Sequence, residues 1–577
     1  MDRVMFPFIV GRPYQWLTLI VLVSGQASAS DSTAMDHYQA VTEIRESQWP
    51  ILGNEDATPQ ELEAALIELQ RGLNYLDQPL IRELALGNLY LYYRGYNIRR
   101  DMAALYARLD RPGKVAEQLR RLREFGVSAG SVDRLREELP SSIQSDVSVA
   151  AELSAWEALD RLASGHAFET DFSPDIGQAE KVAGLSRVWK MAGDHFVHFD
   201  QVPALDWDRA YLETIDRVLD TSSTADYYRE LMRFMARLED GHSNVYPPDE
   251  LHDQFYSRPP MMATRLGDQV IVHEVRSPEL RALGLVPGVE VLAIDGQDVH
   301  DYVREHVQPY QSSSTQQDLD VRSYGYALFS GPADLPLSVK VRFGDGSEET
   351  LSVPRAGYDT IDQRALFERR TLSGGVEYLA LDEFSSDRAL EVWESAWPEI
   401  IEAPALILDL RNNGGGSSWP GYRILAHLID QPVLPGRSWS RSNDSLRLAR
   451  APSVDFDPLE STTIEPIEGP RFQGPVVLLV GPRTFSAAED MAMAFAVSGR
   501  GTIVGQATAG STGQPLFFQL PGGGVARICA KRDTWPDGSD LVGKGVLPDV
   551  EVISTQSDFE SGRDVVLEAG LEVLRNL

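Results

Sequence analysis

The segment "GPRTFSAAEDMAMAF", residues 481–495, contains a serine whose surroundings could support nucleophilic chemistry. Ser486 follows an apolar run at 476–480 and precedes a helical pattern, so the chain passes from a strand through a short turn into a helix. A helix N-terminus favours negative charge that develops on a nucleophile. Ser486 also suits a plain N-cap, because Glu489 three residues later completes a capping box. The segment alone leaves both interpretations open.

A run of three glycines, 414–416, offers a second group that acyl transfer would need. A serine nucleophile requires a base, together with N–H donors for the oxyanion that forms on attack. The glycines follow "ALILDL", a candidate buried strand that ends at Leu410. Glycine lets backbone N–H groups converge on an anion, although the run also suits an ordinary turn. No Gly-Lys-Ser/Thr follows, which excludes a P-loop.

The base must lie upstream, because all ten histidines precede Ser486. His242 in "DGHS" is the best placed by pattern. The preceding segment is apolar at helical spacing, and Gly241 is expected to end that helix in a left-handed conformation. His242 would then emerge on a loop, or it would only complement the dipole at the helix end. Four further histidines are less well placed: His166, His195, His198 and His252.

The elements that must position these residues form a multidomain α/β protein. The N-terminal helical region has clear signals: Thr58 and Glu61 form a capping box, and residues 111–113 separate two helices. The pair resembles a tetratricopeptide hairpin, but no clean repeat period separates an array from an ordinary helical cap. The predicted divisions are a signal peptide at 1–29, helices at 30–150, a helical segment carrying "DGHS" at 151–254, a β-rich domain at 255–356 and an α/β core at 357–577.

The β-rich domain at 255–356 and the α/β core at 357–577 differ in the spacing of their apolar residues. Alternating residues in "PLSVKVRFGDGSEETLSVPR" predict a β-hairpin in the first of them. In the second, the apolar runs "VEYLALDEF", "ALILDL", "PVVLLV" and "GTIVG" predict core strands that alternate with helices.

Composition limits the classes of partner. The net charge of −33 over 577 residues argues against nucleic acid and anionic membranes as partners. Cys529 is the only cysteine, which excludes an intrachain disulfide and a metal cluster of several cysteines. Cys529 is expected to be a buried thiol on a strand. No metal or cofactor is expected.

The N-terminus resembles a secretory signal. Arg3 and Arg12 precede an apolar stretch at 16–23, and Ala27-Ser28-Ala29 is a small-residue cleavage pattern. The stretch is too short to span a bilayer comfortably. The mature chain is therefore expected to be exported, periplasmic or secreted, with no stable membrane insertion after signal removal.

Five short motifs in order resemble the tail-specific, or C-terminal-processing, serine proteases, including their tricorn-core-like branch. The motifs are "DGHS", a β domain similar to a PDZ domain, "DLRNNGGG", "TFSAAE" and "GKGVLPD". The resemblance covers about two thirds of the chain. It implies a PDZ-like domain beside a β/α sandwich protease core.

The resemblance assigns roles to individual residues. It places the nucleophile on Ser486 and the oxyanion donors on the backbone N–H groups of Gly415 and Ala487. Ser511 stands where the processing branch has its catalytic Lys, so a Ser–Lys dyad is not expected. The tricorn-like branch uses a His in the "DGH" region, which favours His242 as the base.

The third catalytic member is open at this stage. The tricorn-like branch tends to place an acid at the position of Val542 here. Asp540 is the nearest substitute and is taken as the candidate. Other acids remain open: Asp240, Asp537 and Glu489.

The expected function is that of an exported serine endopeptidase acting on unfolded or C-terminal segments of proteins through an acyl-enzyme. The expected partner is a protein or peptide substrate, bound by strand addition to the PDZ-like domain, and the sequence leaves the oligomeric state open. The alternative is an inactive member of the same fold that binds peptides or apolar ligands.

We expect residues 1–29 to be removed on export, because a small-residue cleavage pattern follows the Arg-flanked apolar stretch. N-terminal sequencing of the native protein should begin within a few residues of Ser30. A mature chain that starts at Met1 would contradict the prediction.

Overall fold

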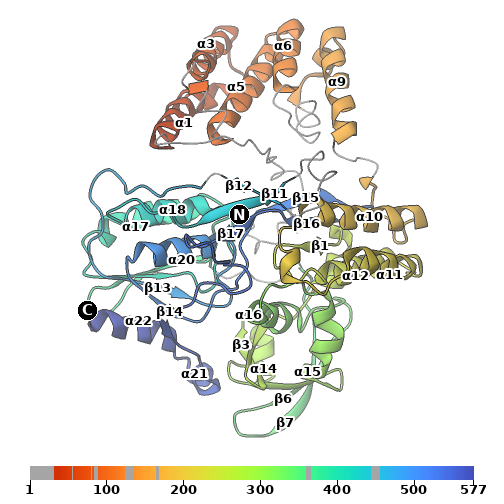
Figure 1. Ribbon diagram of the computed structural model, residues 1–577, viewed down its shortest axis with the longest axis vertical. Helices are drawn as coiled ribbons and strands as arrows, with labels where there is room; N and C mark the ends of the chain where they lie inside the picture. Colours follow the sequence, from red (N-terminus) through yellow and green to blue (C-terminus); the bar gives the residue numbers. More distant parts are fainter. Residues whose placement is uncertain are drawn as a thin grey trace. The chain divides into compact units, whose positions relative to one another are not determined.

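In the computed structural model the chain forms two compact units that divide between residues 167 and 168 (Figure 1). The structure describes residues 31–576 except 55, 79–80, 83–88, 124–135, 137, 164–167, 359–364, 443–454 and 460. The predicted signal peptide at 1–29 lies outside the described residues and stays a prediction. The predicted boundary at 150 falls inside a helix, α9 (Val147–Ala163).

The N-terminal unit is helical in its described part, as the sequence predicted. Thr58 caps the third helix, and the Thr58–Glu61 capping box is present. Two neighbouring helices pack together across a break at 109–111, so residues 112 and 113, predicted to lie in the break, instead begin the second helix. The helices are α1 (Asp31–Glu46), α2 (Trp49–Leu52), α3 (Pro59–Leu76), α5 (Leu89–Arg108), α6 (Pro112–Arg123), α8 (Ser141–Gln144) and α9.

The second unit begins with three helices whose apolar faces share an aromatic core. Trp207 and Phe234 stack with ring centroids 4.2 Å apart, and Tyr227 and Tyr228 are fully buried. These helices are α10 (Gln178–His195), α11 (Trp207–Leu219) and α12 (Thr224–Ala236). They pack with a small antiparallel sheet of order β1-β16-β15, formed by β1 (Asn244–Tyr246), β15 (Pro515–Gln519) and β16 (Val525–Cys529).

A β-rich region follows, with one antiparallel sheet in the order β2-β3-β4-β6-β7 and β5 paired to β4. The predicted hairpin is confirmed, because Leu337, Val339 and Val341 face the core in alternation. The strands are β2 (Met261–Leu266), β3 (Gln269–Val275), β4 (Glu290–Ile294), β5 (Gln297–Asp298), β6 (Leu337–Arg342) and β7 (Glu348–Val353). Its helices are α14 (Pro278–Ala282), α15 (Val299–Tyr302), α16 (Gln316–Asp320) and the π-helical turns Val303–Val307 and Val321–Ala327.

The central sheet has the order β18-β14-β13-β10-β9-β8 and is parallel except for β8. All four predicted core strands are confirmed in it. The strands are β8 (Phe367–Thr371), β9 (Glu377–Leu381), β10 (Leu406–Asp409), β13 (Val476–Val480), β14 (Thr502–Gly505) and β18 (Val550–Glu551).

Helices cover both faces of this sheet, which explains why its strands are continuous apolar runs. Leu406 and Leu408 face a core shared with α17 (Arg388–Ile400), α18 (Ser418–Ala426) and α20 (Ala487–Ser498). Ile407 faces the other side, against α22 (Val565–Arg575). A third small sheet joins β11 (Arg437–Arg441), β12 (Phe456–Leu459) and β17 (Arg532–Thr534), and α21 (Gln556–Ser561) precedes α22.

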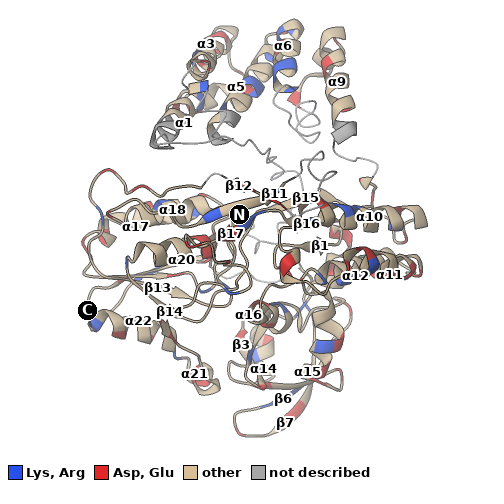
Figure 2. Ribbon diagram, viewed as in Figure 1, with Lys and Arg blue, Asp and Glu red and all other residues tan. Residues whose placement is uncertain are grey.

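The fold is thus a mixture of helices and several sheets. Charged residues of both signs occur along surface helices such as α10 and α11 (Figure 2), where Lys190 pairs with Asp194 and Arg209 with Glu213. Within the described part of the chain, no helix is both long and apolar enough to cross a membrane.

Candidate active site

Ser486 and His242 meet although 244 residues separate them in the chain. The Oγ atom of Ser486 lies 2.9 Å from Nε2 of His242. Ser486 occupies the turn between β13 and α20, and His242 the loop between α12 and β1. The apolar strand β13 fixes the start of this turn, and β1 pairs with β16 directly after His242. The two side chains that the sequence singled out are therefore within hydrogen-bond reach.

The backbone at Ser486 has a conformation that is uncommon for a residue with a side chain, with φ 59° and ψ −127°. This conformation directs Oγ toward His242, and the side chain makes no capping bond to α20. The carboxylate of Glu489 still reaches back to the Ser486 amide at 3.2 Å. Half of the predicted capping box is thus present, while the serine hydroxyl faces the imidazole.

Ser511 contacts the other nitrogen of the imidazole. Its Oγ lies 3.0 Å from Nδ1 of His242, and its carbonyl accepts the amide of Ser486 at 3.0 Å. Because Nε2 can accept the Ser486 proton only when it carries none, the fitting tautomer has the proton on Nδ1, with Ser511 Oγ as its acceptor. Ser511 was expected only to replace a missing Lys. The structure shows instead that Ser511 contacts Nδ1 of His242.

His242 is nearly inaccessible, with 1% of its surface exposed, and it stacks on the ring of Phe485 at 4.6 Å. Burial lowers the pKa of His242 well below 6.5, and the nearby Arg527 and Arg322 lower it further. The imidazole is therefore held in its neutral form, which is the form that can take a proton.

The loop that carries His242 differs from the sequence expectation. Helix α12 ends at Ala236, and Glu239, with φ 49°, is the residue with the left-handed backbone. Gly241 is needed for space instead, since a methyl group there would lie 2.5 Å from Ser511 Oγ. The carbonyl of Gly241 accepts hydrogen bonds from Arg322 at 3.1 Å and Arg527 at 3.3 Å.

Glu489 is a buried carboxylate that holds the loop containing Ser511 against the helix start. It accepts hydrogen bonds from Thr508 Oγ1 at 2.5 Å, from the Gly510 amide at 2.7 Å and from the Ser511 amide at 2.9 Å. Burial raises the pKa of Glu489 to about 7, against the opposing effect of these hydrogen bonds. The sequence identified Glu489 as a capping residue and missed this second role, for which the sequence carries no local signal.

Gly415 lies against the nucleophile turn, as an oxyanion role would require. A methyl group at Gly415 would lie 2.7 Å from Ser486 Cβ and 3.0 Å from the Ala487 amide nitrogen. The Gly415 amide, however, donates to Oδ1 of Asn413 at 2.8 Å. Ala487 and Gly415 are thus brought together, but one of the two N–H groups already has an acceptor.

The structure does not bring Asp540 to His242. Both carboxylate oxygens of Asp540 bind the guanidinium of Arg532, at 2.8 and 2.6 Å. Asp240 accepts the backbone amide of His242 at 3.2 Å and the Ser243 hydroxyl at 2.6 Å, not Nδ1. Ser511 occupies the position next to Nδ1, so the choice of Asp540 as the third member finds no support in the geometry.

The remaining sequence candidates lie elsewhere. Asp537 accepts from Ser539 in an exposed turn. His195 ends α10, and His252 begins the short helix α13 (His252–Phe255). His166 lies outside the described residues.

Comparisons with known proteins agree on a peptidase domain. Residues 375–552 match the model of Peptidase family S41. A "Carboxyl-terminal-processing protease" of Picosynechococcus sp. is 24% identical over 407 residues, which are 68% of this chain and 88% of the relative. A "C-terminal processing peptidase, chloroplastic" of Tetradesmus obliquus is 32% identical over 178 residues, 30% of this chain and 34% of the relative.

A solved structure shows the same fold over a larger part of the chain. The crystal structure of mature CPAF aligns with a TM-score of 0.55 and 16% identity, covering 69% of this chain and 98% of that one.

Replacing Gly415 by alanine should disable Ser486, because the added methyl group would push on the nucleophile turn. Gly538→Ala is the matched control: φ is +89° there and +92° at Gly415, but nothing lies within 4 Å. Both substitutions should carry about 1–2 kcal/mol of backbone strain, measured by denaturant unfolding, and Gly415→Ala should cost more because of its steric contacts. Only Gly415→Ala should slow labelling of Ser486 by a fluorophosphonate. Equal labelling rates in the two variants would refute the close contact.

Proposed function

We propose that this protein is an exported serine endopeptidase that cleaves unfolded or C-terminal segments of proteins, with Ser486 as nucleophile and His242 as base. The match of residues 375–552 to Peptidase family S41 supports a serine-type peptidase. The observation that carries the proposal is the 2.9 Å contact between Ser486 Oγ and His242 Nε2. The names of its relatives support the choice of C-terminal segments as substrate.

The proposed reaction is acyl transfer. His242 removes the proton of Ser486 as Oγ attacks the peptide carbonyl, and the imidazolium then donates that proton to the leaving amine. Water, activated by the same imidazole, releases the acyl group from Ser486. The amide of Ala487 at the N-terminus of α20 donates a hydrogen bond to the oxyanion. The Gly415 amide donates a second one when it shares its hydrogen between Asn413 and the oxyanion or leaves Asn413.

Ser511 is the proposed orienting member in place of an acid. Its hydroxyl accepts the Nδ1 proton of His242 and fixes the imidazole in the tautomer that the reaction needs. A neutral hydroxyl stabilises the imidazolium less than a carboxylate would, so the catalytic contribution of this member is expected to be modest. No step draws on a cofactor.

The β-rich region at 255–356 is the proposed substrate-binding module. It contacts the nucleophile turn, because Arg483, three residues before Ser486, lies 3.1 Å from His273 on β3. Its sheet ends in the edge strands β2 and β7, which suits a substrate that binds by strand addition, as in a PDZ domain.

Four variants test the roles of the site residues. Ser486→Ala, His242→Ala and the double variant should each lose roughly 10²–10⁴-fold in kcat/KM on an unfolded protein substrate, because nucleophile and base act as a unit. Ser511→Ala should lose only about tenfold, the worth of one hydrogen bond.

Near-normal kcat in His242→Ala would contradict the base assignment. A wild-type chain that binds peptides, but neither cleaves them nor labels at Ser486, would instead support the non-catalytic alternative.

The pH dependence of kcat/KM should report the lowered pKa of His242. Because only the neutral imidazole acts as base, activity is present above the pKa of His242 and is lost as the pH falls through it. Burial places that pKa well below 6.5, so the limb that reports His242 should lie below pH 6.5. Protonation of Glu489, whose pKa is about 7, should remove only part of the activity at higher pH, because its carboxylate holds the loop of Ser511. Complete loss of activity above pH 6.5 would contradict the lowered pKa of His242.

A further inference from the structure

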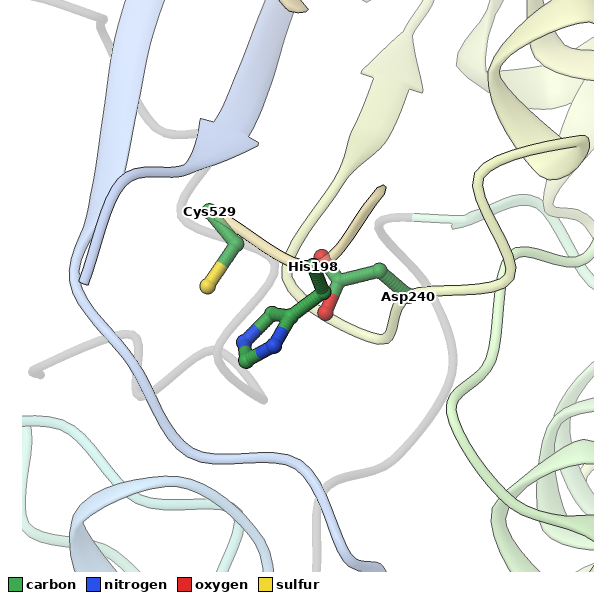
Figure 3. Close-up of side chains that lie close together, drawn as sticks. All are labelled: His198, Asp240 and Cys529. Atoms are coloured by element: carbon green, nitrogen blue, oxygen red, sulfur yellow. The ribbon is translucent and has the colours of Figure 1, made fainter. Parts of the chain in front are cut away.

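Three potential metal ligands converge from distant parts of the chain, one of them on the loop that carries His242 (Figure 3). His198 follows α10, Asp240 lies two residues before His242, and Cys529 ends β16. One donor atom from each lies within 4.8 Å of the others. All three residues are buried, with exposed fractions of 1%, 1% and 0%.

His198 has no hydrogen-bond partner for either ring nitrogen, Nδ1 or Nε2, among the described residues. A buried polar group without a partner is destabilising, so such groups in folded proteins call for an explanation such as a bound ion. In Figure 3 the ring of His198 lies between the sulfur of Cys529 and the carboxylate of Asp240.

We propose that His198, Asp240 and Cys529 bind one Zn²⁺ ion. The donor set of imidazole nitrogen, carboxylate oxygen and thiolate sulfur suits Zn²⁺ and not Ca²⁺ or Mg²⁺, which prefer oxygen ligands. One thiolate and one carboxylate neutralise the two charges of the ion, so the buried complex carries no net charge. Donors of a tetrahedral zinc site lie about 3.3–3.8 Å apart, so the three groups need to close by about an ångström. Water can supply the fourth ligand.

Binding of Zn²⁺ would displace one proton, from Cys529, and would leave the hydrogen bonds of Asp240 in place. The thiol of Cys529, which now donates to the carbonyl of Lys531 at 3.4 Å, loses its proton to solvent and becomes the ligand. Asp240 keeps its contacts to the His242 amide and the Ser243 hydroxyl, because a carboxylate has lone pairs for about four partners. The ion would tie the His242 loop to the ends of α10 and β16 and would take no part in the chemistry at Ser486.

The test uses the full mature chain stripped of metal and titrated with ZnCl₂ in an isothermal calorimeter. We expect one Zn²⁺ per chain and the release of close to one proton, read from the heats in two buffers of different ionisation enthalpy. His198→Ala and Cys529→Ala should weaken binding at least tenfold. His195→Ala, which removes a neighbouring histidine outside the cluster, should bind as the wild type does. CaCl₂ should give no binding.

A second measurement needs no variant to fold. Co²⁺ added to the stripped wild-type chain should give a thiolate-to-metal charge-transfer band, and anomalous scattering at the zinc edge should place the ion between the three donors. Absence of stoichiometric Zn²⁺ binding, absence of that band, or an ion bound elsewhere would each overturn the proposal. These results are independent of the peptidase proposal, since labelling of Ser486 is measured separately.

Discussion

The candidate site depends on the hydrogen bonds that the buried carboxylate of Glu489 accepts. This carboxylate accepts the amide of Ser486 at the start of α20 and three hydrogen bonds from the loop 508–511. That loop in turn places Ser511 against His242, so one side chain holds both the proposed nucleophile, Ser486, and the residue that contacts the proposed base. Desolvation opposes this arrangement, as the raised pKa of Glu489 shows, and the four donors are what make a carboxylate tolerable there.

The sequence predicted the fold where local patterns suffice. Continuous apolar runs identified β9, β10, β13 and β14, because strands covered by helices on both faces must be apolar throughout. Ser486 was singled out by its strand–turn–helix setting. His242 was the best-placed histidine by pattern, and the family resemblance then favoured it as the base. The sequence-based predictions were wrong in a loop. Gly241 was predicted to cap a helix, whereas in the structure its lack of a side chain leaves room for Ser511.

The contact between Ser511 and Nδ1 of His242 was missed at the sequence level. Ser511 was noted only as the residue that stands where a Lys was expected, because a serine has no distinctive pattern that marks it as the partner of an imidazole. Asp540 was chosen as the candidate acid because it lies close in sequence to Val542, the position at which the related proteases tend to have an acid. In the structure both oxygens of the Asp540 carboxylate accept hydrogen bonds from Arg532, and neither binds His242.

The two proposals place different demands on the same short loop. On one side His242 must be neutral and fixed, which burial, Phe485 and Ser511 provide. On the other side of the loop, the carboxylate of Asp240 lies next to the imidazole of His198 and the thiol of Cys529, and neither of these neutral groups balances its negative charge. A divalent cation would balance that charge and would anchor the backbone two residues before His242. The precision of a Ser–His pair depends on such anchoring, because a hydrogen bond near 2.9 Å tolerates little displacement of either partner.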